Sequence, residues 1–295
     1  MNQLVKLLSL GWLSIAAQAD TFESEYLSVQ SEGSGPDVIL IHGFACSPEV
    51  WADLKNAIGA DYRLHTVALA GLAGEPAPAS APDSYLTTLR DELCRYIEIK
   101  ELQRPVLIGH SMGGLIALLV ASLDSAEPGK VIAVDALPFI SLIFNPFATS
   151  ELMQPLAKML EEQLMRLGDL QFETLVSSFI SMMTQSDDKR QQLIEWSRSS
   201  DRKAYAQYLH EIMSYDARPE LNAITCPVYI LYAHDEAMGI PKATLTQLYT
   251  KAYANLKNVH IENIPDSMHF IMWDQPAVFG RKIQQALAQI SPHPF

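Results

Sequence analysis

A serine stands in a pattern of small residues that suits nucleophilic catalysis. Residues 109–113 read Gly-His-Ser-Met-Gly, which matches the spacing G-x-S-x-G. The apolar run Val106 to Ile108 comes directly before this segment, and the apolar stretch Met112 to Ser122 overlaps its end. We therefore expect a strand, a sharp turn and a helix in succession, and the two glycines give the turn the small flanking residues it needs. Such a turn presents Ser111 at the carboxyl edge of a sheet, whereas a serine that only caps the helix is the alternative.

A serine hydroxyl needs a general base, and His269 is the histidine best placed to act as one. Those that follow Ser111 in the chain are His210, His234, His260, His269 and His293. His269 belongs to the segment Pro-Asp-Ser-Met-His-Phe at 265–270, directly after the last predicted strand. A loop at that point leaves the carboxyl edge of a parallel sheet, which is also the edge predicted to carry Ser111.

The base in turn needs a carboxylate that orients it, and three residues are chemically able to do so. Asp235 and Glu236 follow the predicted strand Pro227 to Tyr232, and Asp135 ends an earlier strand. Where a serine sits at this kind of turn, the order along the chain is serine, acid, histidine. Asp235 is favoured as the acid, with Glu236 and Asp135 as alternatives. A loop or helix-capping role is preferred for Asp135.

Backbone N–H groups are expected to stabilise the negative oxygen that develops during acyl transfer. The N–H of Met112, the residue after the serine, is one predicted donor. The loop after the early strand Val38 to Ile41 supplies the second at Phe44, and Gly43 lets the backbone approach closely. His42 lies in the same loop, where a structural hydrogen bond is favoured over a role as the base.

Short apolar runs alternate with helical stretches along most of the chain. The runs are Val38 to Ile41, Leu64 to Leu69, Val106 to Ile108, Val131 to Val134, Pro227 to Tyr232 and Val259 to Ile264. Continuous apolar character is typical of strands that are buried on both faces of a parallel sheet. The sequence therefore predicts a doubly wound α/β fold with a mostly parallel sheet.

Two segments fall outside that alternation. Residues 1–19 combine Lys6, a short apolar stretch and Ala17-Gln18-Ala19. This pattern indicates a signal peptide, so that the mature chain would begin at Asp20 and be exported, either periplasmic or secreted. Residues 139–219 show helical patterns without a clear strand, which predicts a helical cap inserted into a core of residues 20–138 and 220–295. The apolar, methionine-rich cap favours a hydrophobic acyl or aryl substrate.

Composition narrows the class of partner. Lys and Arg number 21 against 34 Asp and Glu, and the formal net charge of −13 argues against binding to nucleic acid or to an anionic membrane surface. No run of about 18 apolar residues follows the N-terminal segment, so we expect no stable membrane insertion after signal cleavage. The metal-binding spacings H-E-x-x-H and C-x-x-C are missing, and we expect neither a metal nor a cofactor. A small hydrophobic molecule is the expected partner.

Together these residues resemble the α/β-hydrolase superfamily, in its capped branch of small esterases and lipases. The resemblance rests on His-Gly-Phe at 42–44, Gly-His-Ser-Met-Gly-Gly at 109–114, Asp235 after a late strand, and Asp-Ser-Met-His-Phe at 266–270. The sequence departs from the family pattern at Ala233, where glycine is usual before the acid, and at Glu236 beside Asp235.

The resemblance implies a serine hydrolase that cleaves a carboxylic ester through an acyl-enzyme intermediate, without a cofactor. Lactones, thioesters and carbon–carbon bonds are alternative substrates for the same three side chains. A catalytically silent protein that binds a small molecule is the non-enzymatic alternative. Ser111 argues against relatives with a carboxylate nucleophile, such as haloalkane dehalogenases and epoxide hydrolases.

Overall fold

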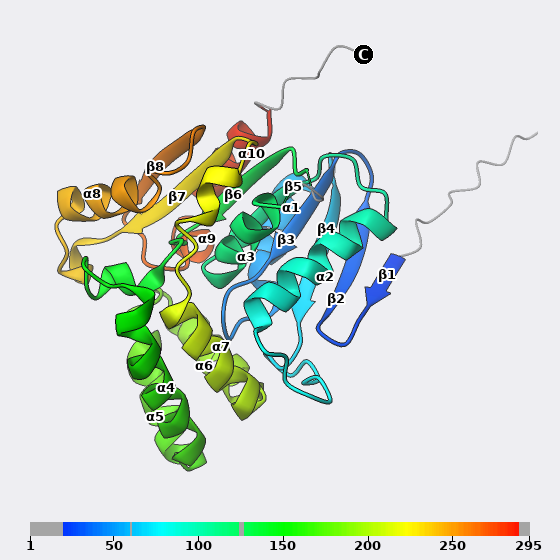
Figure 1. Cartoon of the computed structure of the whole chain (residues 1–295). Helices are drawn as coiled ribbons and strands as arrows, with labels where there is room; N and C mark the ends of the chain where they lie inside the picture. The colour runs from blue at the N-terminus through cyan, green and yellow to red at the C-terminus, as the bar shows by residue number, and fades with distance from the viewer. Residues whose placement is uncertain (1–19, 60, 124–126, 289–295) are drawn as a thin grey trace, which may run out of the picture.

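The strands form one sheet that runs through the molecule (Figure 1). The computed structural model describes residues 20–59, 61–123 and 127–288, and within these ranges eight strands pair in the order β1-β2-β4-β3-β5-β6-β7-β8. They are β1 (Asp20–Glu23), β2 (Leu27–Gly33), β3 (Asp37–Ile41), β4 (Arg63–Leu69), β5 (Val106–His110), β6 (Lys130–Val134), β7 (Val228–His234) and β8 (Val259–Pro265). β1 and β2 pair antiparallel at one edge, and β3 to β8 run parallel. The predicted α/β class with a mostly parallel sheet is confirmed.

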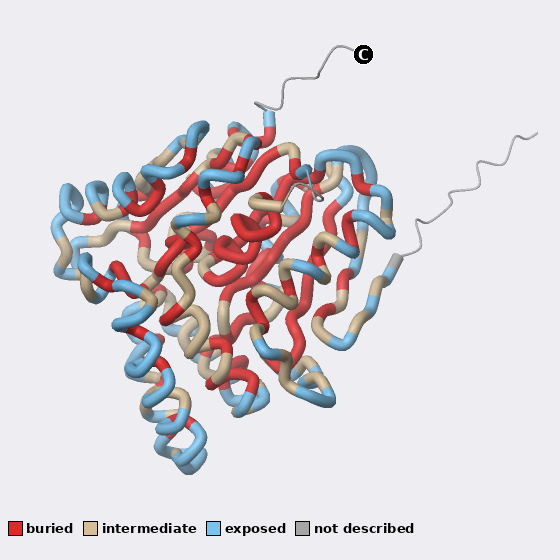
Figure 2. Tube along the Cα trace, viewed as in Figure 1, coloured by how far each residue is buried: buried red, intermediate tan, exposed pale blue. Residues whose placement is uncertain are grey.

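Strand β3 shows why the parallel strands are apolar without alternation. Val38 and Leu40 pack into one buried cluster, while Ile39 and Ile41 pack into another on the opposite face. Successive side chains of a strand point to opposite faces, so both faces must be covered for every residue to be buried. Figure 2 shows the strands in the middle of the sheet as buried along most of their length.

Helices cover both faces of the sheet. α2 (Tyr85–Ile99), α3 (Met112–Ala121) and α8 (Lys242–Ala252) contribute side chains to the cluster on one face. α1 (Ala52–Ile58), α9 (Ile271–Asp274) and α10 (Pro276–Ala288) contribute to the other. The 3₁₀ turns η1 (Pro48–Trp51) and η4 (Glu236–Met238) lie in loops after β3 and β7. This arrangement leaves the carboxyl ends of β3, β5, β6, β7 and β8 to carry loops rather than core.

A helical segment separates β6 from β7. It contains η2 (Ile140–Ile143), α4 (Ser150–Arg166), α5 (Asp169–Ile180), α6 (Asp187–Ser199), α7 (Arg202–Ser214) and η3 (Glu220–Ala223). We call the part from 139 to 219 the cap. α4 packs along α7 and α5 along α6, and α4 and α5 project away from the sheet (Figure 1).

Three of the cap helices, α4, α6 and α7, begin where short polar side chains accept first-turn N–H groups. Thr149 accepts from Leu152, and Asp201 accepts from Ala204. On α4 the side chains of Met153, Ala157 and Leu164 are buried, whereas apolar side chains at other positions of α4 and α5 are exposed. The exposed ones are Leu152, Leu156, Met159, Met165, Leu170 and Phe179. Helical spacing places buried and exposed residues on different faces of one helix.

The structure also bears on the N-terminal segment, the cysteines and the question of membrane-spanning helices. The predicted signal peptide, residues 1–19, lies outside the described residues, and β1 begins at Asp20. Cys46 and Cys226 are buried, free thiols. Within the part of the chain that the structure describes, none of the helices is both long and apolar enough to cross a membrane.

Candidate active site

The turn between β5 and α3 holds Ser111 in a strained backbone conformation. Its φ of 52° and ψ of −120° are unusual for any residue other than glycine. The Ser111 N–H donates to the Val134 carbonyl over 2.9 Å, which ties the turn to the neighbouring strand β6. A side chain at Gly109 would collide with the backbone of Gly113, so the turn requires glycine there. The predicted strand–turn–helix context of the serine is therefore present.

The loop after β8 brings His269 to this turn. His110, the residue before Ser111, donates from Nε2 to the His269 carbonyl over 3.0 Å. The His110 and His269 rings lie with their centroids 4.6 Å apart. Burial, with a smaller effect of His269, holds the pKa of His110 well below its ordinary value. A neutral His110 therefore supports His269 from the same turn that carries the serine.

Asp135, not Asp235, is the carboxylate in contact with His269. His269 Nδ1 lies 2.7 Å from Asp135 Oδ2, and the two side chains are 22% and 12% exposed. Because a carboxylate only accepts, this contact assigns the proton to Nδ1 and leaves Nε2 able to take another. Asp135 itself lies at a φ of 43°, a second strained residue at the same edge.

Two donors hold the other oxygen of that carboxylate. Asp135 Oδ1 accepts from the Ala233 N–H over 2.8 Å and from the Tyr249 hydroxyl over 3.1 Å. Burial and the nearby Asp135 raise the pKa of Tyr249 well above its ordinary value, so the phenol remains a donor. The departure from glycine at 233 thus lies at a residue whose backbone orients the acid.

The prediction that favoured Asp235 as the partner of His269 is wrong, and the reason is the order of the strands. Asp135 follows β6, which lies next to β5 and its serine, whereas Asp235 follows β7, one strand further away. Asp235 Oδ1 accepts from the Ala237 N–H over 2.7 Å, and Oδ2 accepts from Gln185 Nε2 over 2.9 Å. Glu236, the other alternative, is exposed at the start of η4.

The loop 42–44 lies against the serine. A Cβ added at Gly43 would stand 2.9 Å from His110 Nδ1 and 3.2 Å from the Ser111 Cβ, so a larger residue here would force its neighbours to shift. Phe44 is the residue directly after Gly43. Met112 directly follows Ser111 and is the first residue of α3. Both residues predicted to supply N–H donors thus lie beside Ser111.

His42 is a structural residue, as predicted. Its Nδ1 lies 2.8 Å from the Gly43 carbonyl, and its Nε2 lies 3.2 Å from the Leu69 N–H. The first contact requires a proton on Nδ1 and the second requires a bare Nε2, which is the neutral imidazole. Complete burial lowers the pKa of His42 to about 4, in agreement with that form.

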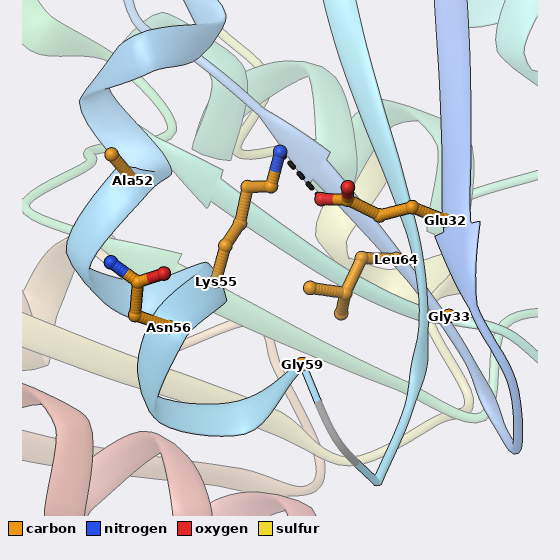
Figure 3. Close-up of a pocket in the computed structure, with 7 residues that line it drawn as sticks. All are labelled: Glu32, Gly33, Ala52, Lys55, Asn56, Gly59 and Leu64. Carbon is orange, nitrogen blue, oxygen red and sulfur yellow. Dashed lines mark ion pairs between the residues drawn. The ribbon is translucent and has the colours of Figure 1, made fainter. Parts of the chain in front are cut away.

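The other features of the molecule do not add to this site. In the described ranges, His, Cys, Asp and Glu side chains do not gather in a group that could hold a metal ion. A hollow of about 460 Å³ between α1, β2 and β4 is lined by Lys55, Glu32 and Leu64 (Figure 3). Lys55 and Glu32 form an ion pair of 2.6 Å across it. It lies at the amino end of β4, the opposite edge from Ser111.

Comparison with known proteins assigns the class of the molecule. A doubly wound sheet with a serine on a strained strand-to-helix turn defines a hydrolase fold. The chain belongs to the alpha/beta hydrolase family, whose sequence model matches residues 38–281. The family assignment agrees with the resemblance carried by residues 42–44, 109–114 and 266–270.

The chain is similar to curated esterases and to solved structures of an esterase and a lactonase. The chain is 24% identical over 216 residues to a pimeloyl-[acyl-carrier protein] methyl ester esterase of Vibrio atlanticus, covering 71% of this chain and 80% of that one. It is 26% identical over 230 residues to the esterase of the same name from Aeromonas salmonicida, covering 75% and 85%. A thermophilic esterase from Thermogutta terrifontis superposes with a TM-score of 0.75 at 18% identity, over 93% of this chain and 100% of that one. The enol-lactonase from Burkholderia xenovorans superposes with a TM-score of 0.70 at 17% identity, over 89% and 97%.

Proposed function

We propose that this protein is a serine esterase in which Ser111 is the nucleophile, His269 the general base and Asp135 the acid that orients the base. The observation that carries the proposal is the 2.7 Å contact between His269 and Asp135 beside the strained serine turn. Similarity to two curated methyl ester esterases supports an ester as the substrate. Asp235 has no part in this chemistry.

The reaction follows from the position of each proton. His269 Nε2 takes the hydroxyl proton as Ser111 Oγ attacks the ester carbonyl carbon, and the N–H groups of Phe44 and Met112 stabilise the resulting oxyanion. Collapse of this intermediate breaks the bond to the alcohol, which leaves with the proton from His269. Water, deprotonated by His269, then attacks the acyl-serine and releases the acid. Asp135 keeps the imidazole in the tautomer that both halves require.

Aromatic packing between the cap and the loop at Phe44 supports a hydrophobic acyl or aryl group in the substrate. The Phe44 ring packs on Tyr205 of α7 with centroids 4.4 Å apart, and Tyr205 packs on Phe172 of α5 at 5.1 Å. Phe44 is partly exposed, while Tyr205 and Phe172 are buried. The cap thus packs aromatic side chains directly against the predicted oxyanion loop.

Labelling with a fluorophosphonate tests the nucleophile without knowledge of the substrate. Intact mass should show one adduct per wild-type chain, none on Ser111→Ala, and labelling about 1000-fold slower on His269→Ala. A folded wild-type protein that binds small hydrophobic esters but takes no label would contradict the proposal and favour a binding protein.

A series of p-nitrophenyl esters tests the acyl group. We expect kcat/KM to rise with acyl length, because each buried methylene contributes about 0.8 kcal/mol. Equal turnover of acetate and long-chain esters would contradict an apolar acyl site. Higher kcat/KM for a lactone or a thioester than for every oxygen ester would assign the protein to one of those alternatives.

We also propose that the protein is exported. The pattern of residues 1–19, with Lys6, a short apolar stretch and Ala17-Gln18-Ala19, supports this proposal. Mass measurement of the protein purified from a fractionated host cell should give a chain that begins at Asp20, outside the cytoplasm. A full-length chain in the cytoplasm would contradict it.

A further inference from the structure

One carboxylate, Asp274, binds both the cap and the loop of His269. Asp274, the last residue of α9, accepts from the Thr184 hydroxyl over 2.6 Å and from the Gln185 N–H over 3.0 Å, both at Oδ1. Its Oδ2 accepts from the Met268 N–H over 2.8 Å. Residues 183–185, which we call the junction segment, connect α5 with α6. One oxygen of Asp274 therefore binds the cap and the other binds the residue before His269.

The residue after His269 is bound to the same segment. The Phe270 N–H donates to the Met183 carbonyl over 3.1 Å. Thr184 is completely buried, so its hydroxyl has no water to replace a lost partner. The peptide groups on both sides of His269 are thus held by the junction segment or by the carboxylate that binds it.

A further residue of the junction segment extends the network. Gln185 Nε2 donates to the Asp266 carbonyl over 3.1 Å and to Asp235 Oδ2 over 2.9 Å. The Asp266 carbonyl also accepts from Gln275 Nε2 over 2.8 Å. Asp266 lies at a φ of 54°, so the loop that leads to His269 turns at a strained residue held from both sides.

We infer that Asp274 is a positioning residue for His269, and that it makes the position of the base depend on the junction segment of the cap. The inference rests on the proposed role of His269 as general base. A base must stand within a few tenths of an ångström of its productive position, and a displacement of about 1 Å costs about 100-fold in rate. The partners of Asp274 are Thr184, Gln185 and Met268, so we expect its effect on the reaction to pass through His269.

The chain contains a matched control for this inference. Glu211 of α7 also connects cap and core through one hydroxyl and two backbone N–H groups. Its carboxylate accepts from the Ser84 hydroxyl over 2.7 Å, from the Tyr85 N–H over 2.8 Å and from the Leu86 N–H over 2.9 Å. These donors open α2, and they lie outside the loop of His269. Glu211→Gln therefore weakens a cap-to-core contact of the same composition without touching the base.

The test compares Asp274→Asn with Glu211→Gln in the full-length protein. Both substitutions should lower Tm, because each replaces a charged acceptor of at least three hydrogen bonds. We expect Asp274→Asn to lower kcat about 10- to 100-fold with KM within about twofold, and to slow fluorophosphonate labelling by a similar factor. Glu211→Gln should change kcat and the labelling rate by less than about twofold.

A second pair of variants keeps the test decisive if Asp274→Asn folds poorly. Thr184→Val removes the hydroxyl while keeping the shape, and Thr184→Ser keeps the hydroxyl. We expect a loss in kcat of about threefold or more for valine and recovery to near wild type for serine. Equal kcat for Asp274→Asn and Glu211→Gln, or for Thr184→Val and Thr184→Ser, would overturn the inference while wild-type labelling at Ser111 still supports the esterase. Absence of wild-type labelling would overturn both.

Discussion

Two carboxylates at the same edge of the sheet do different work. Asp135 and Asp235 each follow a parallel strand, and each stands between Ser111 and His269 in the chain. Asp135 binds His269, whereas Asp235 binds Gln185 of the cap. The difference teaches that position in the sheet, rather than order along the chain, decides which acid meets the base.

The surroundings of the two residues differ as much as their partners. One oxygen of Asp135 receives two donors, Ala233 and Tyr249, and the other oxygen is left for the imidazole. One oxygen of Asp235 accepts from the Ala237 N–H in η4, and the other accepts from the side-chain amide of Gln185. The loop at Asp135 thus orients the imidazole ring of His269, whereas the loop at Asp235 connects the cap to the core.

The largest expected effect comes from removing the charge of Asp135. Asp135→Asn should lower kcat about 1000- to 10,000-fold, because an amide can donate to Nδ1 and so stabilise the wrong tautomer of His269. Steady-state kinetics on a p-nitrophenyl ester, with Tm as a check of folding, measure the loss. The matched variant Asp235→Asn should retain most of its activity, and an equal loss in both variants would refute the comparison.

The next effect is a loss of stability at low pH caused by the buried His42, which limits the pH range in which variants at Asp135 and Asp235 can be compared. His42 has a native pKa of about 4 against an ordinary 6.5, so between these values the unfolded chain binds more protons than the native one. Its contribution to stability is therefore complete above pH 6.5 and is lost as the pH falls, by roughly 3 kcal/mol at pH 4. Urea unfolding at pH 7 and pH 4.5 measures this slope, and His42→Gln should reduce it. An unchanged free energy of unfolding in the wild type would contradict the neutral, buried imidazole.

A smaller loss of activity is expected when the Tyr249 hydroxyl, which donates to Asp135, is removed. Tyr249→Phe removes one hydroxyl donor from Asp135 Oδ1 and leaves the ring in place. We expect kcat to fall about fivefold, the equivalent of one hydrogen bond of about 1 kcal/mol, with KM unchanged. Tyr232→Phe is the control, since that hydroxyl bonds to Thr246 rather than to Asp135. Equal kcat for the two variants would show that Tyr249 does not position the acid.

The smallest effect is expected at Asp235 itself. Asp235→Asn should change kcat less than about threefold and lower the free energy of unfolding by about 1 kcal/mol, through the lost helix-end contact at Ala237 and a weaker bond to Gln185. Kinetics and urea unfolding of the same preparation separate the two effects. A loss in kcat that matches Asp135→Asn would mean that Asp235 acts in catalysis after all.

Local sequence patterns predicted the parts of the site that local geometry controls. The turn at 109–113 needs small residues next to its serine, and the close approach of residue 43 favours glycine, so both are visible as motifs. The inner parallel strands, β3 to β7, are visible because burial on both faces demands continuous apolar residues. The antiparallel strands β1 and β2 were not predicted, because at the sheet edge their side chains are partly exposed and polar residues interrupt the pattern.

Motifs and apolar runs were enough to predict the fold class, the serine turn, the loop at Gly43 and the candidate base. Which of Asp135 and Asp235 contacts His269 depends on the tertiary structure, because both satisfy the order serine, acid, histidine, and the contact is set by which strand lies beside β5. The same holds for Tyr249 and Asp274, whose partners lie 114 residues and up to 90 residues away in the chain. The residue types in a short motif are restricted by the local backbone conformation and so can be recognised in the sequence. The partner of a long-range hydrogen bond depends instead on how the whole sheet and cap are assembled.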